Sequence, residues 1–411
     1  MNVDIQAIRS DTPLLASTVY MDTAAASLPP DAVLDAVRTY VLDTGHIGIY
    51  LPAFRKATYE RVEGVRQRLA LFLGAQPQEV AFTKNATESI SLIARGIDWQ
   101  RGDEVLVADT EMLSNLLPWR RLEVTHGVVV KMVASDAQGR LSPEAFAQAV
   151  TPRTRLLTFS HIPNSTGVVQ PAAEICAVAR KHGFWSLVNA SQSVGLVGVD
   201  VEHIGCDFLA GCGRKALRAT EGTGFLYIRE ALIGSIEPVL AGWWNGSYDR
   251  QTGALSFVAG ARRFEAGCPI VPSIVGLGAA LDYATRIGIE AIEARVQELT
   301  AYAIGHLSGI DGFELYGPPD AKGRIGIVPF NLRGTDPSRI VAALEQQHCI
   351  IEAGGFMADA ILARYGVSTM ARVSLHYFNT REDIDHMVAA IRAIRAIRNL
   401  QPIHRTSKEH S

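Results

Sequence analysis

Lys215 is the residue of this chain whose neighbours best equip it to act as a nucleophile. It is one of only seven lysines and lies in "LAGCGRKALRATEGTGFLYI", where glycines and other small residues predict a tight turn close to a ligand. Arg214 and Arg218 are close by, and in a partly buried turn their charges favour the neutral amine. A lysine with a lowered pKa suits Schiff-base chemistry. The alternative is an ordinary surface lysine, so other segments must decide.

Two amides follow what the sequence predicts to be a buried strand. "LVNASQSVG", residues 187–195, begins with an apolar pair and runs into a turn that carries Asn189 and Gln192. In open parallel sheets, ligands bind beyond the carboxyl ends of the strands. We therefore expect both amides to face a ligand.

A candidate anion site lies in "EVAFTKNATESISLIARGI". Asn85 and Glu88 have the spacing of a capping box that starts a helix. The backbone amides of Ala86 and Thr87, with the Thr87 hydroxyl, would then face an anion at the helix N-terminus. An ordinary capped helix with no ligand is the alternative.

A phosphate site, a strand-end amide and a lysine on a turn together predict pyridoxal phosphate (PLP), held as a Schiff base with a partner at its ring nitrogen. The sequence contains no G-x-S-x-G, H-E-x-x-H or Walker A motif. "GCGRKA" lacks the last glycine of a dinucleotide fingerprint, and "GLGAAL" lies in a helical pattern that favours close helix packing. Neither supports a nicotinamide enzyme, and no metal site is predicted.

The elements that must position these residues alternate between strands and helices. Helical patterns such as "PAAEICAVARKHG", which ends in Gly183, separate several short apolar runs. This alternation predicts an α/β fold with a mostly parallel sheet covered by helices. The predicted strands are "EVAF", "DEVLVAD", "VVVKMVA", "RLLTFSH", "WSLVNA", "CDFLAG" and "TGFLYI".

The remaining segments predict a division into an arm, two domains and a tail. An N-terminal arm (1–30) precedes a large cofactor-binding domain (31–270). A smaller α+β domain (271–400) contains the helical patterns "IVGLGAALDYATRIG" and "IEAIEARVQELTAYAIGHL", then the strands "IGIVPFNL" and "ARVSLHYF". Its last helix starts near Thr380 and Asp383, which have capping-box spacing. The polar tail (401–411) is expected to be disordered.

Composition indicates a folded cytoplasmic protein. The 411 residues are 48% hydrophobic and 20% charged, with a net charge of -3, which predicts a substantial core and no nucleic-acid footprint. No apolar run has bilayer length, and the N-terminus has no signal-peptide pattern. The five widely spaced cysteines suit a reducing compartment.

Seven segments match, in order, segments of one enzyme family. "YMDTAAASLP" is similar to "YLDNAATSLP", "FTKNATESISLIA" to a phosphate turn, "TEMLSNLLPW" to "EHNSNLLPW", and "SHIPNSTGVVQP" to "SHVSNxTG". "GRKALRATEGTGFLY" is close to "GRKWLRGPRGTGFLY", "RRFEAGCP" to "RFEAGTP", and "ARVSLHYFNT" to a segment with a carboxylate-binding arginine. Over roughly residues 18–395 the chain resembles the class V aminotransferase family of fold type I PLP enzymes. Its lysine motif is similar to those of isopenicillin N epimerase-like proteins and of ergothioneine-type C–S lyases.

The resemblance implies roles at the substrate side of the site. Lys215 would form the Schiff base and then move protons as general acid and base. Arg372 would bind the substrate carboxylate as a bidentate fork. Asn164 would lie beside the ring on the substrate side, and Ala25, in the N-terminal segment, would also contact substrate.

The resemblance also implies how the cofactor is held. Ala86 and Thr87 would bind the phosphate, and Gln192 the phenolic oxygen of the ring. The turn "AGCP", with Cys268, would reach the phosphate of a partner subunit, so a homodimer with shared active sites is expected.

Several positions depart from the family pattern. Asn189 stands where the family has an aspartate that keeps the pyridine nitrogen protonated, so the ring should be a weaker electron sink and full transamination is disfavoured. Met112 replaces a histidine stacked on the ring; its thioether packs but moves no proton. Cys212 replaces a phosphate-binding serine and Cys268 a threonine, each a poorer hydrogen-bond donor, which the charge of Arg214 would offset.

The resemblance predicts a lyase in preference to a sulfur-carrier desulfurase. Desulfurases of the family carry a persulfide-forming cysteine in a loop before the carboxylate arginine. The corresponding loop, "IIEAGGFMADAILARYGVSTMAR", has no cysteine, and Cys349 just upstream is expected to be a buried strand residue. The predicted reaction is beta-elimination from an S-substituted cysteine, giving a thiol, pyruvate and ammonia.

Two alternatives remain open at this stage. One is an amino-acid epimerase, which a second carboxylate-binding arginine (Arg262 or Arg263) in a bulky apolar pocket would favour. The other is a PLP-free protein that keeps the fold and binds a ligand or partner. "AGWWNGSYD", residues 241–249, is expected to lie over the pocket, where Trp243 and Trp244 would either stack on a large substrate or pack in an interface.

Overall fold

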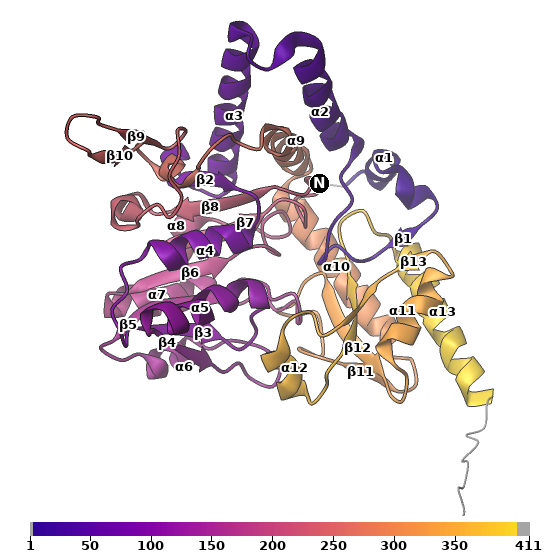
Figure 1. Cartoon of the computed structure of the whole chain (residues 1–411). Helices are drawn as coiled ribbons and strands as arrows, with labels where there is room; N and C mark the ends of the chain where they lie inside the picture. Colours follow the sequence, from indigo (N-terminus) through magenta and orange to yellow (C-terminus); the bar gives the residue numbers. More distant parts are fainter. Residues whose placement is uncertain (1–2, 401–411) are drawn as a thin grey trace, which may run out of the picture.

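The computed structural model describes residues 3–400 (Figure 1). The expected disorder of the tail concerns residues 401–411, which lie outside this range. Among the described residues, no helix combines the length and apolar character needed to cross a membrane.

A seven-stranded sheet forms the centre of the larger part of the molecule. Its strand order is β2-β8-β7-β6-β5-β3-β4. All pairings within it are parallel except those of β8, which runs antiparallel to both of its neighbours. The strands are β2 (Val80–Thr83), β3 (Glu104–Ala108), β4 (Val129–Val133), β5 (Thr154–Ser160), β6 (Trp185–Asn189), β7 (Phe208–Cys212) and β8 (Gly224–Ile228). Each predicted strand is confirmed, as is the mostly parallel α/β sheet.

Helices cover both faces of this sheet because successive strand residues point in opposite directions. On β6, for example, Leu187 packs into one buried cluster and Val188 into another. Near-continuous apolar strands are what a sheet buried on both faces requires. The covering helices include α4 (Ala86–Gly96), α5 (Leu117–His126), α6 (Pro143–Ala149), α7 (Ala172–His182) and α8 (Val201–Ile204). Helix α7 ends at Gly183, as predicted, with a left-handed φ of 76°.

A second sheet lies in the C-terminal part of the chain, with strand order β11-β12-β15-β14. All its pairings are antiparallel. Its strands are β11 (Phe313–Leu315), β12 (Ile327–Leu332), β14 (Glu352–Gly354) and β15 (Met370–Ser374), with helices α10 (Ile289–Leu307), α11 (Pro337–Glu345), α12 (Asp359–Tyr365) and α13 (Arg381–Leu400). Thr380 and Asp383 form the predicted capping box before α13, since each side chain accepts a hydrogen bond from the other's backbone amide at 3.1 Å.

The N-terminal arm joins the C-terminal part instead of standing apart. After α1 (Ile5–Ser10), strand β1 (Val19–Tyr20) pairs in parallel with β13 (Cys349–Ile350). The next residues continue along β15, where Asp22 forms a bridge with Ser374. The first and last thirds of the chain are thereby held together.

Helices α2 (Asp31–Asp43) and α3 (Pro52–Phe72) project beyond the sheet, linked by a π-helical turn at Thr44–Gly48 (Figure 1). Their bases pack on α9 (Val271–Ile287), where Gly276 and Gly278 lie in the "GLGAAL" segment. A Cβ on Gly278 would lie 2.7 Å from a methyl group of Val65. The predicted close helix packing is therefore confirmed. A hairpin of β9 (Gly246–Tyr248) and β10 (Leu255–Phe257) extends from another edge.

Candidate active site

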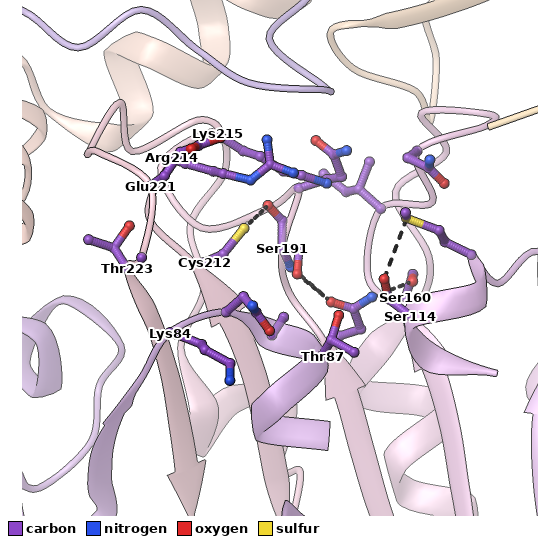
Figure 2. A pocket seen from close by; sticks show the side chains of 18 residues that line it. Lys84, Thr87, Ser114, Ser160, Ser191, Cys212, Arg214, Lys215, Glu221 and Thr223 are labelled. Carbon is purple, nitrogen blue, oxygen red and sulfur yellow. Dashed lines mark hydrogen bonds between the residues drawn. The ribbon is translucent and has the colours of Figure 1, made fainter. Parts of the chain in front are cut away.

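The carboxyl ends of β5, β6 and β7 open onto a cavity of about 370 Å³. Cavities of this size hold cofactors and small substrates. Figure 2 shows Lys215 and Arg214 on one side of it, across from Thr87 and Lys84 at the start of α4. Most of the sequence-predicted site residues meet here: Ala86, Thr87, Met112, Asn164, Asn189, Gln192, Cys212, Arg214 and Lys215 all line the cavity.

Lys215 presents a buried amine to this cavity. Its side chain has neither a hydrogen-bond nor an ion-pair partner among the described residues, and the residue is 7% exposed. Burial lowers its pKa to about 8, and the charges of Arg214 and Arg372 act in the same direction. Arg218, which was also expected to lower this pKa, does not contribute to the shift. Its guanidinium instead donates to the Leu28 carbonyl at 2.7 Å and to the Tyr377 hydroxyl at 3.0 Å.

The turn around Lys215 is tight because its backbone packs on the strand-end segment. Gly195, with a φ of 90°, lies so close that a Cβ on it would be 2.6 Å from the Leu217 nitrogen. The turn closes on itself through the Arg218 amide, which donates to the Lys215 carbonyl at 2.9 Å. The glycine of "LVNASQSVG" is thus required for the position of the lysine.

Helix α4 begins at the cavity wall. Asn85 Oδ1 accepts the Glu88 amide at 2.9 Å, which confirms the predicted cap. The returning Glu88 carboxylate binds the Lys84 amide at 2.7 Å, one residue earlier than the capping-box pattern places it. The amides of Ala86 and Thr87 belong to the first turn, where no preceding carbonyl accepts them, so they remain available to an anion.

Asn189 ends β6 and is fixed by its neighbours. Its Oδ1 accepts the backbone amide of Ser191 at 3.2 Å and the Ser191 hydroxyl at 2.7 Å. Its Nδ2 donates to Ser160 Oγ at 3.1 Å. Gln192, one turn further on, donates to the Ala24 carbonyl at 2.8 Å, so one of its two N–H groups remains for a ligand.

Glu111 lies directly behind this wall, and sequence reasoning missed it. It is 3% exposed and accepts hydrogen bonds from Ser160 Oγ and Asn115 Nδ2, both at 2.7 Å, and from the Ser160 amide. Burial raises its pKa to about 7, against the effect of these donors, and Asp109 raises it further. The only local signal was a carboxylate directly before Met112, which does not indicate burial by itself.

Arg372 approaches the cavity from β15 without lining it. Its Nη1 donates to the Asn164 carbonyl at 3.2 Å, and its Nη2 contacts Asp22 at 3.0 Å and also Glu352. The guanidinium packs over the Phe356 ring, 4.3 Å from its centroid. A carboxylate-binding fork at this position therefore already has two acidic neighbours.

Arg214 and Ala25 contact each other at the mouth of the cavity. Arg214 Nη1 donates to the Ala25 carbonyl, and the Ser27 amide returns a bond to the Arg214 carbonyl at 2.9 Å. Ala25 therefore borders the lysine turn without lining the cavity itself. The Met112 sulfur accepts the Ser114 hydroxyl at 3.9 Å, and Cys212 Sγ donates to the Ser191 carbonyl at 3.9 Å.

Cys268 and the paired tryptophans lie outside the cavity. Cys268 is exposed and borders a neighbouring cavity of about 260 Å³, which shares Lys84 and Thr223 with the first. The expectation that residues 241–249 cover the pocket is wrong for this chain by itself, because Trp244 packs on Tyr59, 5.0 Å between ring centroids. Trp243 is exposed and lines neither cavity.

The two arginines that would favour an epimerase are engaged elsewhere. Arg262 lies over the Trp244 ring at 5.3 Å, and Arg263 over the Phe257 ring at 5.5 Å. Neither lines either cavity. This chain therefore brings no second carboxylate-binding arginine from that segment to the site.

Comparison with known proteins decides the family. The model of the class V aminotransferases matches residues 19–387. The chain belongs to the class V aminotransferase family. The predicted fold type I architecture is thereby confirmed.

Similar class V proteins have been described as enzymes of sulfur chemistry. A "probable cysteine desulfurase" of Methanothermobacter thermautotrophicus is 36% identical over 392 residues, covering 92% of this chain and 94% of the relative. The apo structure of a cysteine desulfurase from Thermococcus onnurineus NA1 has a TM-score of 0.90 at 30% identity, covering 96% and 98% of the two chains. The cystine C–S lyase C-DES, in complex with its product cysteine persulfide, has a TM-score of 0.84 at 25% identity, covering 93% and 99%.

PLP is the cofactor of this class V enzyme, and the residues of the cavity fit it. The amine of Lys215, without a partner in the described part of the chain, faces the cavity from one side, and the open amides of α4 face it from the other. Lys84 at the start of α4 and Arg214 on the opposite side add positive charge to the cavity, which favours a phosphate. Asn189 and Gln192 add polar side chains to the lining of the cavity.

Proposed function

We propose that this enzyme cleaves the Cβ–S bond of an S-substituted cysteine and releases the thiol directly. The products are a thiol, pyruvate and ammonia, and one water is consumed. The cystine C–S lyase activity of C-DES supports this reaction class. Direct release distinguishes the proposal from desulfuration through a persulfide on the enzyme.

The observation that carries the proposal is the loop that precedes Arg372. Residues 350–372 contain no cysteine. The loop is nevertheless fastened at the site, since Asn164 Nδ2 donates to the Phe356 carbonyl at 3.1 Å and the Leu113 amide to the Met357 carbonyl at 2.8 Å. Met357 is 58% exposed, but a thioether cannot accept a sulfur atom as a persulfide.

The nearest cysteine upstream does not replace the missing one. Cys349 belongs to β13, where it is 1% exposed and paired with Val19 of β1. Burial raises its pKa to about 12, so almost no thiolate forms at neutral pH. The prediction of a buried core thiol is confirmed.

Each residue of the site has its own role in this reaction. When bound, PLP supplies an electron sink for negative charge at the α carbon of the amino acid. Lys215 Nζ, whose lowered pKa leaves it partly neutral near pH 8, removes the α proton and protonates the departing sulfur. Ala86 and Thr87 hold the phosphate, Gln192 and Asn189 the ring, and Arg372 the substrate carboxylate.

The proposal is tested with purified holoenzyme and a panel of S-substituted cysteines, together with l-cysteine and l-cystine. We expect thiol, pyruvate and ammonia in equal amounts. The variant Lys215→Ala should lose both turnover and the visible absorption of the bound cofactor. The exposed Lys181 on α7 supplies the matched control, and Lys181→Ala should retain both.

Alanine in place of pyruvate would overturn the proposal, since it is the product expected when sulfur alone is removed. Racemised substrate without thiol release would instead support an epimerase. Failure of the parent protein to bind PLP would contradict the assignment of the whole site.

We further propose a homodimer in which each "AGCP" turn reaches the other subunit's phosphate site. Cys268 is exposed on a cavity that adjoins the PLP cavity through Lys84 and Thr223. Light scattering gives the oligomeric state. Mixing Lys215→Ala subunits with Cys268→Trp subunits should restore activity, although neither variant is active alone. A monomeric protein, or a mixture that stays inactive, would contradict active sites shared between two subunits.

A further inference from the structure

The hydrogen bonds of Asn189 leave it only a donor for the cavity. An amide oxygen accepts two hydrogen bonds, and Asn189 Oδ1 already receives two, from the backbone and the hydroxyl of Ser191. An amide nitrogen has two N–H groups, and one of them is directed at Ser160 Oγ. What remains is one N–H of Asn189, on a residue that lines the cavity.

The orientation of this amide is fixed by its surroundings. Rotation by 180° would place the NH₂ group against the Ser191 backbone N–H, which cannot accept a hydrogen bond. The rotated oxygen would in turn face Ser160 Oγ, whose hydrogen already points to Glu111. Both changes cost hydrogen bonds in a buried position.

Glu111 determines which way the hydroxyl of Ser160 points. The carboxylate accepts from the Ser160 hydroxyl, the Ser160 amide and Asn115 Nδ2, and none of the described residues brings a cation into contact with it. A carboxylate surrounded by donors acts as an acceptor, so the Ser160 hydrogen is directed to it. The lone pair of Ser160 is then left for the amide nitrogen of Asn189.

We propose that Glu111 and Ser160 are positioning residues that hold Asn189 as a hydrogen-bond donor, so that the site binds PLP with an unprotonated pyridine nitrogen. This inference rests on the proposed function, which places Asn189 beside the ring nitrogen. A protonated nitrogen would bring a second N–H against the amide N–H, with no acceptor between them.

The consequence for the reaction is a ring that withdraws fewer electrons than a protonated one. Negative charge then stays nearer the α carbon, where departure of a β substituent relieves it. The arrangement therefore favours elimination over transamination. It does so through Ser160 on β5 and Glu111 in the segment after β3, not through Lys215.

The protonation of the ring is measured directly by nitrogen NMR. The parent holoenzyme, loaded with PLP labelled with ¹⁵N in the pyridine ring, is compared at pH 8 with free PLP at acid and alkaline pH. We expect the parent resonance near that of the unprotonated reference. In Asn189→Asp it should move toward the protonated reference, because a carboxylate accepts from the ring N–H. A protonated resonance in the parent would overturn the inference, and this measurement requires no variant.

The positioning role is tested with Ser160→Ala and Glu111→Gln. We expect each to shift the ¹⁵N resonance and to weaken PLP binding several-fold, whereas Ser160→Thr, which keeps the hydroxyl, should restore the parental shift. Ser193→Ala is the matched control, since Ser193 is a buried serine near Asn189 whose hydroxyl, as far as the chain is described, donates to the Ala190 carbonyl alone, at 3.2 Å. Unchanged resonances in both Ser160→Ala and Glu111→Gln would overturn the role.

The two proposals fail in distinguishable ways. A parent protein that binds no PLP would contradict the proposed function. A parent that binds PLP with a protonated ring nitrogen and still eliminates thiol would contradict only the role given to Glu111, Ser160 and Asn189.

Discussion

Glu352 and Arg372 face each other across the β14–β15 pair and contact through Nη2 of the arginine. The same nitrogen reaches Asp22 at 3.0 Å, whereas the buried Nε of Arg372 has no hydrogen-bond partner among the described residues. Of the two acidic neighbours, Glu352 is the more exposed, with 42% of its side chain accessible against 15% for Asp22. A substrate carboxylate that binds Arg372 must therefore compete with Glu352.

The variant Glu352→Gln should bind amino acids more tightly, because it removes a negative charge that competes for Arg372. We expect the Kd of l-alanine, which has a carboxylate but no leaving group, to fall about 1.4- to five-fold, as ion pairs with an exposed partner contribute roughly 0.2–1 kcal/mol. Spectroscopic titration of the holoenzyme measures it. Glu314→Gln removes a glutamate of similar exposure, which pairs with the exposed Arg333, and should leave the Kd unchanged. Equal or weaker binding in Glu352→Gln would exclude competition.

Removing the buried amine should stabilise the apo protein in a pH-dependent way. Native Lys215, with its pKa lowered to about 8, binds fewer protons between pH 8 and 10.5 than the unfolded lysine does, so stability of the parent rises with pH in this window. Below pH 8 the full cost of burying the charge is present, about 3 kcal/mol at roughly 1.4 kcal/mol per pKa unit. Lys215→Met should remove this cost, so its advantage is largest near pH 7 and disappears toward pH 10.5. Urea unfolding across this range measures it, with Lys181→Met as control; a constant difference would contradict the lowered pKa.

Gly195→Ala should destabilise the turn around Lys215 by more than the positive φ of Gly195 alone accounts for. Its Cβ would lie 2.6 Å from the Leu217 nitrogen, whereas a Cβ on Gly183, at a similar positive φ, would meet no atom within 4 Å. We expect Gly183→Ala to cost about 1 kcal/mol of unfolding free energy and Gly195→Ala about 2–4 kcal/mol. Only Gly195→Ala should also weaken PLP binding. Equal losses in the two variants would mean that the contact with the turn is unimportant.

Asn85→Ala should affect both helix stability and phosphate binding. Loss of its cap on α4 should cost about 1 kcal/mol, the same as loss of the cap that Ser142 provides to the Ala145 amide at 3.2 Å on α6. The Kd for PLP should rise several-fold in Asn85→Ala and stay parental in Ser142→Ala. Calorimetric titration of the apo forms distinguishes the two, and parallel Kd values would argue against an anion site at α4.

Local patterns were sufficient to predict the strands and the convergence of the site. Apolar runs ended by Asn189 and Cys212 identified β6 and β7, and parallel strands necessarily bring their carboxyl ends to one edge. The cap by Asn85 was predictable because it needs only neighbours three residues apart.

Contacts set by tertiary register were not predictable in this way. Glu111 is 49 residues from Ser160, and no local pattern relates them. Glu352 opposes Arg372 only because β14 and β15 pair antiparallel in one particular register. Arg218 was expected to act on Lys215, but its left-handed backbone, with a φ of 61°, directs its side chain toward Tyr377 instead.

The pairing of β1 with β13 sets the earliest point during synthesis at which the active site can form. A ribosome delivers Val19 and Asp22 more than three hundred residues before Cys349 and Ser374, their partners. Until then the substrate side of the site, beside Ala24 and Arg372, is not assembled, because the Ala24 amide is held by the Ser374 hydroxyl at 2.9 Å. A nascent chain thus has neither a finished substrate side nor a finished lysine turn, because Arg218 donates to the Tyr377 hydroxyl and the Ala216 carbonyl contacts Nε2 of His376. Both are completed only once the C-terminal part of the chain has emerged.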